Sequence, residues 1–353
     1  MSRLWNRRVA SLDPYVPGEQ PAALDLLKLN TNELPYGPSP KALAAIRAAC
    51  DDTLRLYPDP TSMALRQAIA ARFDTTADRV FVGNGSDEVL AHAFRGLVRD
   101  DAPLLFADVS YGFYPVYCGL FDQPYREIPL RSDFSIDVDD YTGTCGGIAI
   151  ANPNANTGIA LPAEDIERLA VAQPDSTIIV DEAYVDFGAQ SAVSLTHRHD
   201  NILVVQTVSK SRALAGLRVG YAIGHPDLIE GLTRVKDSFN SYPLDRLAQI
   251  GAAAALEDTT WLNEATGRVI ETRAQLAASL NDRGFHVLPS CANFILVQHP
   301  THRATDIQQH LRDRHIIVRR LSHPRIQNWL RISIGTNQDS GRLLSALDDF
   351  RTF

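Results

Sequence analysis

The sequence predicts an α/β protein with a large, mostly parallel sheet flanked by helices, followed by a smaller α+β domain. Short apolar runs alternate with amphipathic segments from about residue 79 to residue 224, as the crossover connections of a parallel sheet require. Beyond Asn240-Ser241-Tyr242-Pro243, which breaks this pattern, long helical segments mix with short strands. The 353 residues suffice for two domains, and 45% hydrophobic with 22% charged residues is ordinary for a globular chain.

Composition argues against several classes of protein. A formal net charge of -8 does not suit a general nucleic-acid binder. The four cysteines form no Cys-x-x-Cys pair, so we expect reduced thiols in a cytoplasmic protein rather than a zinc or redox motif. His197 and His199 have no third ligand nearby, so no metal site is expected. No apolar segment follows Arg3, Arg7 and Arg8, so we expect neither a signal peptide nor a membrane span.

The N-terminal part is expected to form an extended arm over residues 1–30. Two prolines and a glycine within Pro14-Tyr15-Val16-Pro17-Gly18 exclude a helix interior. A helix is expected to open at Ser39 or Pro40, and a second covers Ser62–Phe73. We expect a large domain over residues 31–240 and a small domain over residues 241–353.

Six short apolar runs are expected to form the large sheet because each is bounded by turn or loop residues. They are Val80-Phe81-Val82, Leu104-Leu105-Phe106, Ile148-Ala149-Ile150, Thr177–Val180, Ile202–Val205 and Val219–Ile223. Helices are expected after Ser86 and over Ala163–Ala172 and Pro226–Val235. The small domain is expected to contain a long helix ending at Arg283-Gly284, helices at about 303–314 and 338–350, and the strands Phe285–Leu288, Phe294–Val297, Ile316–Val318 and Leu330–Ile334.

Lys210 is the candidate reactive residue. It is one of only four lysines among 34 basic residues, and it follows a buried strand and lies among small residues. Such a setting suits a lysine that forms a Schiff base with a carbonyl compound. The alternative is a lysine whose ammonium group reaches solvent at the end of a strand.

Two further patterns predict a ligand site at the same edge of the sheet. Asp181 follows a buried strand, and an acid at this position points into the ligand crevice of an open α/β sheet. The turn Gly83-Asn84-Gly85-Ser86-Asp87-Glu88 leads from a strand into a helix, with Ser86 as a suitable N-cap. The free amides at such a helix start bind anions.

The segment Ser209-Lys210, followed after six residues by Leu217-Arg218-Val219-Gly220-Tyr221, resembles the cofactor-lysine segment of fold-type-I pyridoxal-phosphate aminotransferases. The resemblance implies that Lys210 carries pyridoxal 5′-phosphate and that Asp181 keeps its ring nitrogen protonated. It also implies a homodimer in which Tyr57 reaches the cofactor phosphate of the other subunit. The further cofactor contacts that it implies are Gly85, Ser86, Asp87, Tyr111, Asn154, Tyr184, Ser209 and Arg218.

The loop after the third predicted strand departs from the family pattern. This chain has Asn152-Pro153-Asn154-Ala155-Asn156-Thr157-Gly158 where the family usually has Asn-Pro-Asn-Asn-Pro-Thr-Gly. Ala155 stands where a second asparagine is common, and Asn156 replaces a proline. Asn154 is the first candidate for the contact to the cofactor hydroxyl, and Asn156 is the second.

Pro14-Tyr15-Val16-Pro17-Gly18 and Leu29-Asn30-Thr31-Asn32-Glu33 are similar to the N-terminal segments of histidinol-phosphate aminotransferases. The resemblance implies that Tyr15, Asn32, Arg319 and Arg331 bind the substrate. The implied reaction converts L-histidinol phosphate and 2-oxoglutarate into imidazole-acetol phosphate and L-glutamate, a step of histidine biosynthesis.

Three alternatives stay open at this stage. An aromatic-amino-acid aminotransferase or a threonine-phosphate decarboxylase would use the same scaffold. A cofactor-binding regulator without turnover is the third, and the intact set of Lys210, Asp181 and Arg218 counts against it. The sequence does not rank the amino donors.

Overall fold

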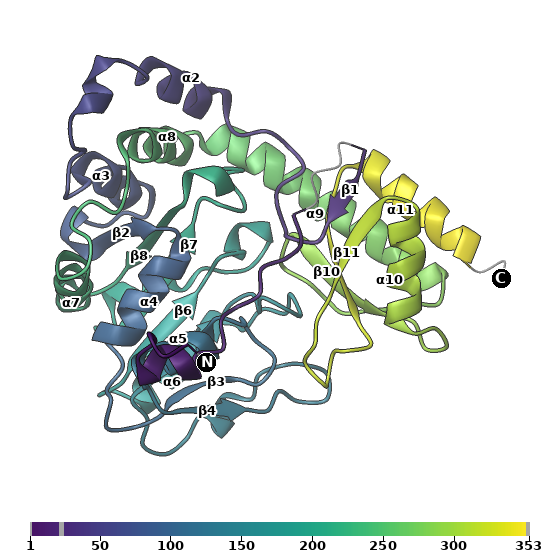
Figure 1. The fold of residues 1–353 in the computed structure, drawn as a ribbon, viewed down its shortest axis with the longest axis horizontal. Helices are drawn as coiled ribbons and strands as arrows, with labels where there is room; N and C mark the ends of the chain where they lie inside the picture. The colour runs from purple at the N-terminus through teal and green to yellow at the C-terminus, as the bar shows by residue number, and fades with distance from the viewer. Residues whose placement is uncertain (1, 21–24, 351–353) are drawn as a thin grey trace.

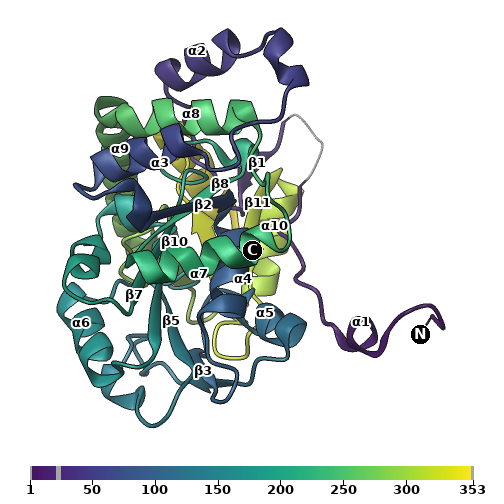
Figure 2. The ribbon, with the colours of Figure 1, turned by 90° about the vertical axis from the view of Figure 1, so that its left-hand side faces the viewer.

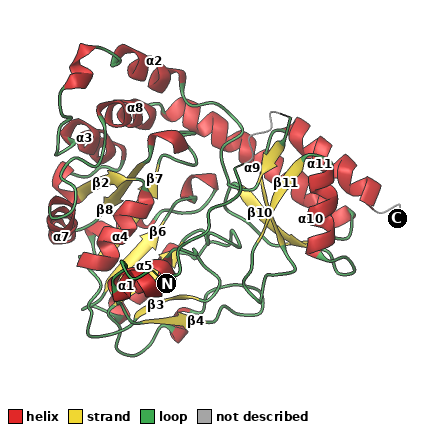
Figure 3. Ribbon diagram, viewed as in Figure 1, coloured by secondary structure: helices red, strands yellow, loops and turns green. Residues whose placement is uncertain are grey.

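The computed structural model describes residues 2–20 and 25–350, which form a large and a small lobe (Figure 1). The large lobe contains a seven-stranded sheet of order β2-β8-β7-β6-β5-β3-β4, with helices on both faces (Figure 3). Its strands are β2 (Val80–Asn84), β3 (Leu104–Ala107), β4 (Tyr125–Ile128), β5 (Gly147–Ala151), β6 (Thr177–Asp181), β7 (Ile202–Thr207) and β8 (Val219–Ile223). The predicted fold class, an α/β protein with a mostly parallel sheet, is confirmed.

Strand direction decides where the functional loops meet. Strands β4, β3, β5, β6 and β7 are parallel neighbours, and β8 runs antiparallel to both β7 and β2. Every residue of β5, β6 and β7 is buried, as expected for strands covered on both faces. The register pairs Ala151 with Asp181 and Asp181 with Val205, so the chain leaves these three strands at one edge.

The helices of the large lobe pack their apolar sides against the two faces of the sheet. They are α2 (Pro40–Ala48), α3 (Met63–Arg72), α4 (Ser86–Gly96), α5 (Tyr114–Phe121), α6 (Ala163–Ala172), α7 (Pro226–Asp237) and α8 (Arg246–Glu257). The expected start of α2 is correct: Pro40 is its first residue, and Ser39 Oγ accepts from Lys41 N at 3.1 Å. Short 3-10 helices cover Asp52–Arg55, Ala77–Arg79, Val138–Asp140, Val185–Phe187, Ala192–His197 and Ala215–Leu217.

The small lobe is built on a five-stranded sheet of order β1-β11-β12-β10-β9. Its strands are β1 (Leu27–Leu29), β9 (His286–Val287), β10 (Phe294–Gln298), β11 (Ile316–Arg320) and β12 (Leu330–Ser333). Helices α10 (Ala304–Asp313) and α11 (Asn337–Phe350) pack beside it. The long helix α9 (Thr259–Asp282) starts near the end of α8 and runs into the small lobe (Figure 1).

Two segments lie in other lobes than the sequence analysis expected. Strand β1 belongs to the expected arm of residues 1–30, but it pairs in parallel with β11 in the small sheet. Helix α8 belongs to the expected small domain of residues 241–353, but its Ala248, Ala252 and Leu256 pack in the large-lobe core. The division into arm, large domain and small domain therefore stays a proposal, with β1 moved to the small domain and the boundary moved into α9.

The arm before β1 contains one short helix, α1 (Arg7–Ser11), which stands away from the lobes (Figure 2). Asn6 caps it by accepting a hydrogen bond from Val9 N at 2.8 Å. An ion pair between Arg8 and Asp122 links the arm to the end of α5. Among the described helices, none combines the length and the apolar character needed to cross a membrane.

Candidate active site

A cavity of about 720 Å³ opens where the arm, the strand ends of the large sheet and the small sheet meet. This volume suits a cofactor together with a small substrate. The sequence-predicted residues that line it are Tyr15, Asn32, Ser86, Asp87, Tyr111, Asp181, Tyr184, Ser209, Lys210, Arg218, Arg319 and Arg331. Gly85, Asn154 and Tyr57 are not among the described residues of the lining.

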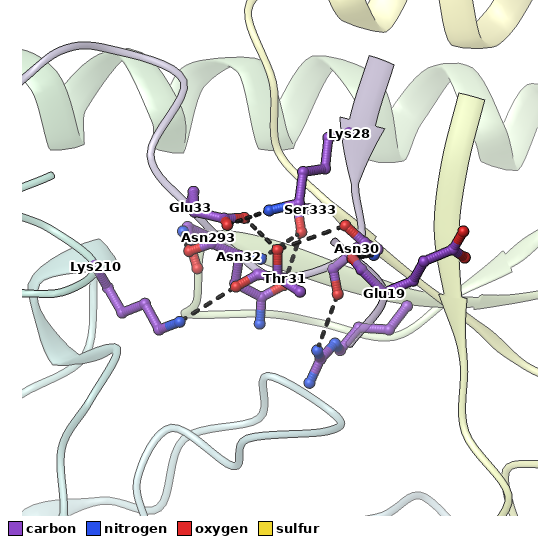
Figure 4. A network of polar contacts seen from close by, with 10 residues as sticks. Glu19, Lys28, Asn30, Thr31, Asn32, Glu33, Lys210, Asn293 and Ser333 are labelled. Carbon is purple, nitrogen blue, oxygen red and sulfur yellow. Dashed lines mark hydrogen bonds and ion pairs between the residues drawn. The ribbon is translucent and has the colours of Figure 1, made fainter. Parts of the chain in front are cut away.

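Lys210 directs its amine into the cavity rather than to the outer surface. It follows β7, and its Nζ donates a hydrogen bond of 3.2 Å to the carbonyl oxygen of Thr31 (Figure 4). Nζ also lies 5.8 Å from the centre of the Tyr184 ring. This placement favours the reactive lysine over a lysine whose ammonium group is held in solvent.

Asp181 ends β6 as a buried carboxyl group without a cationic partner. Its Oδ2 accepts from the Tyr114 hydroxyl at 3.1 Å and its Oδ1 from Ala183 N at 3.3 Å. Within residues 2–20 and 25–350, no lysine or arginine forms an ion pair with it. Burial raises the pKa of Asp181 to about 7, and a hydrogen bond from Tyr114 only partly offsets this effect. A protonated ring nitrogen is the kind of partner that this site lacks.

The start of α4 offers backbone amides to an anion. Gly85, and not Ser86 as expected, is the N-cap, with φ +85° and no side chain capping the helix. Ser86 and Asp87, the first two residues of the helix, line the cavity. Arg218 adds a positive charge there, although its NH2 group also contacts Asp87 Oδ2 at 3.2 Å. This end of the cavity therefore suits a phosphate group.

A glycine beneath this turn allows the helix start to approach the sheet. A Cβ atom on Gly220 of β8 would lie 2.2 Å from Ser86 N and 2.3 Å from Gly85 C. Such distances are shorter than any van der Waals contact, and both neighbours are backbone atoms that cannot move aside alone. Gly220 is thus a structural requirement of the anion site, although it touches no ligand itself.

Thr207 is a lining residue that the sequence analysis missed. Its Oγ1 lies 3.0 Å from Ser209 Oγ and accepts from Ser209 N at 3.1 Å, which fixes the turn before Lys210. The signal for it was the change from apolar to polar residues at the end of the strand Ile202–Thr207.

Aromatic side chains form another wall of the cavity. The Tyr111 hydroxyl donates to Asp87 Oδ1 at 2.7 Å, and burial together with the Asp87 charge raises the pKa of Tyr111 well above its ordinary value. Tyr15, from the arm, stacks on Phe113 with ring centres 4.3 Å apart and lies 6.4 Å from Tyr111. Tyr111 is therefore a neutral ring beside the anion site, available for stacking on a planar ligand.

The loop after β5 separates the two asparagine candidates. Asn154 is buried, and all its bonds are internal: Nδ2 donates to Val109 O at 2.7 Å, and Oδ1 accepts from Asn156 N at 2.9 Å and Thr157 N at 3.1 Å. Asn156 lines the cavity, and its Nδ2 donates one hydrogen to Ser110 O. The geometry therefore favours Asn156, the second candidate, for contact with a ligand.

Two arginines enter the cavity from the small lobe. Arg319 on β11 and Arg331 on β12 are cross-strand neighbours. Arg331 NH1 donates to Ala155 O at 2.9 Å, Arg319 NH2 donates to Val16 O at 3.4 Å, and Arg331 Nε is buried without a partner. No ion pair joins either guanidinium to a carboxylate in the described part of the chain. Two adjacent cations with only carbonyl partners suit an anionic ligand.

Tyr57 lies outside the cavity on an exposed surface. It is 80% exposed, and its ring lies 4.8 Å from that of Tyr242. Further apolar side chains are exposed near Tyr57 in the sequence and in the connection between α7 and α8. They are Leu54, Leu56, Met63, Phe239 and Tyr242. Exposed apolar groups of this kind are typical of a protein interface.

The residues present fit pyridoxal 5′-phosphate. The cavity combines the Lys210 amine, the buried Asp181 carboxyl group without a cation, and an uncapped helix start beside Arg218. These groups match the three chemically distinct parts of that cofactor, namely its aldehyde, its ring nitrogen and its phosphate. In the part of the chain that the structure describes, no group of His, Cys, Asp and Glu side chains is arranged to hold a metal.

Comparison with known proteins points to the same chemistry. The sequence profile of the family "Aminotransferase class I and II" matches residues 25–347. Histidinol-phosphate aminotransferase 2 of Gluconobacter oxydans (strain 621H) is 71% identical, over 99% of this chain and 98% of that protein. Histidinol-phosphate aminotransferase of Acetobacter pasteurianus is 59% identical, over 99% of this chain and 98% of its own length.

A solved structure extends the likeness to three dimensions. The crystal structure of histidinol-phosphate aminotransferase from Sinorhizobium meliloti in complex with pyridoxal-5′-phosphate superposes with a TM-score of 0.89. The two sequences are 26% identical, and the match covers 100% of this chain and 99% of the other.

Proposed function

This chain belongs to the class I and II aminotransferase family, and from that premise we propose that it is a pyridoxal-phosphate-dependent histidinol-phosphate aminotransferase. It transfers the amino group of L-histidinol phosphate to 2-oxoglutarate, giving imidazole-acetol phosphate and L-glutamate in histidine biosynthesis. The observation that carries the choice of substrate is the pair Arg319 and Arg331, which enter the cavity and, among the described residues, form hydrogen bonds only to carbonyl oxygens.

The large lobe holds the cofactor. When bound, pyridoxal phosphate supplies an electron sink that stabilises negative charge on the carbon that bears the substrate's amine. Lys210 Nζ would hold the cofactor at its aldehyde group, and the ionised Asp181 would accept the N–H of the ring. The amides at the start of α4, with Ser209 and Arg218, bind the phosphate, and Tyr111 packs on the ring.

Lys210 also moves the proton. With the cofactor and substrate bound, its Nζ would act as a base inside the cavity and take the proton from the carbon that bears the substrate's amine. Its hydrogen bond to Thr31 O keeps the amine on the side of the cavity that faces the arm. The Tyr184 ring beneath Nζ limits its movement to the outside.

The small lobe and the arm select the second ligand. Arg319 and Arg331 bind the phosphate of histidinol phosphate in one half-reaction and a carboxylate of 2-oxoglutarate in the other. Tyr15, which lines the same cavity, adds a hydroxyl donor. Both substrates therefore place an anion on the same pair of cations.

The working unit is a cytoplasmic homodimer in this proposal. The exposed apolar residues around Tyr57 supply a surface that a second copy would bury. Tyr57 then reaches the cofactor phosphate of the other subunit, which accounts for its position outside the cavity of its own chain.

An assay of several amino donors with 2-oxoglutarate tests the proposal. L-histidinol phosphate should give the highest kcat/KM for glutamate formation, with phenylalanine well below it. A preference for phenylalanine would identify an aromatic aminotransferase instead, and release of carbon dioxide from threonine phosphate would identify a decarboxylase. Cofactor binding without turnover of any donor would identify a cofactor-binding regulator instead of an enzyme.

A further inference from the structure

Asn32 lies at the point where the arm, the small lobe and the large lobe meet. It follows β1, is 1% exposed, and has φ +59°, a left-handed conformation that asparagine tolerates better than most residues. Its carbonyl oxygen accepts a hydrogen bond of 2.8 Å from Asn293 Nδ2 (Figure 4). A buried residue fixed in this way has little freedom to follow a ligand.

The side chain of Asn32 is oriented by Ser333. Asn32 N donates to Ser333 Oγ at 2.9 Å, and Ser333 Oγ donates in turn to Asn32 Oδ1 at 2.7 Å. The amide oxygen therefore faces the small lobe, and the amide nitrogen faces the large lobe. There Asn32 Nδ2 donates a hydrogen bond of 3.0 Å to the hydroxyl oxygen of Tyr184.

This bond determines which way the Tyr184 hydroxyl can donate. The Tyr184 oxygen accepts from Asn32, so the hydroxyl hydrogen must point to another acceptor. In the described part of the chain no acceptor receives it, and Tyr184 lines the cavity with Lys210 Nζ 5.8 Å from its ring. The free hydrogen of Tyr184 is therefore left for a ligand.

We propose that Asn32 is a positioning residue, which keeps the Tyr184 hydroxyl hydrogen directed at the phenolic oxygen of bound pyridoxal phosphate. The inference rests on the proposed cofactor chemistry, but not on the choice of histidinol phosphate as substrate. It assigns Asn32 an effect through Tyr184 in place of the substrate contact that the sequence predicts. Because Ser333 and Arg331 lie two residues apart on β12, the substrate-anion site and Tyr184 are joined through Asn32.

The variant Asn32→Asp replaces the amide nitrogen that donates to Tyr184 with a carboxylate oxygen that can only accept. The shape of the side chain changes little. Aspartate tolerates the left-handed backbone, and its carboxylate only accepts hydrogen bonds, so Tyr184 would donate to it and turn away from the ligand. A donor to the phenolic oxygen favours the deprotonated linkage between Lys210 and the cofactor, in which that oxygen carries the most negative charge. Loss of this donor should raise the pH midpoint of the cofactor's visible absorbance by about one to two units.

A double-mutant cycle separates this effect from a general structural one. Tyr184→Phe alone should also raise the midpoint, and Asn32→Asp should then add less than half of the shift that it causes in the presence of Tyr184. Asn30→Asp is the matched control for charge: Asn30 is buried two residues earlier and donates to Glu19 O at 2.9 Å, without contact to Tyr184. Its midpoint should change less than that of Asn32→Asp.

The outcomes distinguish the inference from the function on which it rests. If the unsubstituted protein with pyridoxal phosphate shows no visible band, both are wrong. If the band forms but Asn32→Asp moves its midpoint no more than Asn30→Asp, or moves it equally with and without Tyr184, only the inference is wrong. If Asn32→Asp does not fold, Ser333→Ala takes its place in the same cycle, with an expected rise of a fraction of a unit that disappears in Tyr184→Phe.

Discussion

The two walls of the cavity are built in different ways. On the large-lobe wall, Asp181 ends one buried strand and Lys210 follows its neighbour, and local hydrogen bonds fix the turn before Lys210. On the small-lobe wall, Arg319 and Arg331 stand on paired strands, and among the described residues their hydrogen bonds go only to carbonyl oxygens of other segments. The first wall suits a ligand that stays, and the second suits ligands that exchange.

The difference follows from the cost of burying charge. Asp181 is fully buried, and its pKa stays raised as long as no cation lies beside it. It therefore suits one permanent cationic partner. Arg331 lines the open cavity and remains a cation, although burial lowers its pKa. An enzyme that binds a phosphate in one half-reaction and a carboxylate in the other needs cations that are not already paired with a carboxylate of the protein.

Lys210→Ala should remove the covalent function of the large-lobe wall entirely. We expect loss of the cofactor adduct that borohydride fixes, together with nearly all turnover, because no other lysine among residues 2–20 and 25–350 lines the cavity. Lys41→Ala, at an exposed lysine of α2, is the control and should keep both. An adduct on the same peptide of Lys210→Ala would contradict the assignment.

Asp181→Asn should weaken cofactor binding and lower kcat by orders of magnitude, because the ring nitrogen loses its ionised partner. Glu182→Gln is the matched control. Glu182 is the adjacent buried acid, but it faces away from the cavity and accepts from Ala192 N, Ser191 and Gln206. Cofactor affinity and kcat should fall in the first variant only. Equal losses in both would mean that Asp181 acts through the fold.

Arg319→Ala tests the exchangeable wall. Loss of one cation from a partly buried phosphate should cost about 2–5 kcal/mol in kcat/KM for histidinol phosphate. It should cost much less for phenylalanine, if that donor is used, and cofactor affinity should stay the same. Arg320→Ala, at the exposed next residue of β11, should change none of these quantities. Equal losses with both donors would make Arg319 structural.

The two adjacent acids also predict how stability depends on pH. Burial raises the pKa of both Asp181 and Glu182 to about 7. Between pH 4 and pH 7 the folded chain therefore holds protons that the unfolded chain releases, and stability falls as the pH rises.

Cofactor binding should remove the contribution of Asp181 to this pH dependence of stability and leave the contribution of Glu182. Thermal unfolding of the cofactor-free protein should show a smaller loss of Tm between pH 4 and pH 7 in Asp181→Asn and in Glu182→Gln than in the unsubstituted protein. With the cofactor bound, Asp181 is ionised, so only Glu182→Gln should still change the slope. Identical slopes with and without the cofactor would contradict the role of Asp181.

Tyr57 should give the smallest effect, because in the proposed dimer it would add one hydrogen bond to a phosphate that other groups already bind. Tyr57→Phe should raise the cofactor Kd about tenfold, the equivalent of roughly 1.5 kcal/mol. Light scattering should show a dimer for both proteins. An active monomer at assay concentration would exclude a shared site.

Mixed dimers show whether Tyr57 acts in its own subunit or in the other. Lys210→Ala and Tyr57→Phe subunits are combined at a cofactor concentration at which Tyr57→Phe dimers are mostly empty. If Tyr57 serves the other subunit, each mixed dimer has one site with both residues intact, and activity rises above that of either parent. If Tyr57 serves its own subunit, no site is intact and activity does not rise.

Much of the large lobe could be predicted from the sequence because its central strands are continuous apolar runs. All six predicted runs fall within observed strands. Strand β4 was missed because Tyr125, Arg126 and Glu127 are exposed at the edge of the sheet, where burial leaves no pattern. Helix α5 was missed because it has only eight residues and follows an aromatic turn.

Contacts between distant segments limited the prediction of the site. Residues at the strand ends, such as Asp181 and Lys210, could be read because strand position alone brings them to one edge. The role of Asn32 could not, since its partners Tyr184 and Ser333 are 152 and 301 positions away. Its place in the motif favours Asn154, whereas only the structure reveals that its side chain already bonds to Val109 O and to two amides of its own loop.

The pairing of β1 with β11 bears on how the chain folds during its synthesis. Leu27 pairs with Ile316, so the edge of the small sheet cannot close until the ribosome has added 289 more residues. At roughly 5–20 residues per second, this interval lasts about 15–60 s. The large-lobe strands are synthesised within this interval, while Leu27 and Leu29 have no sheet to join. A nascent chain stalled before residue 316 should therefore keep this N-terminal segment open to proteases, and release of the full chain should protect it.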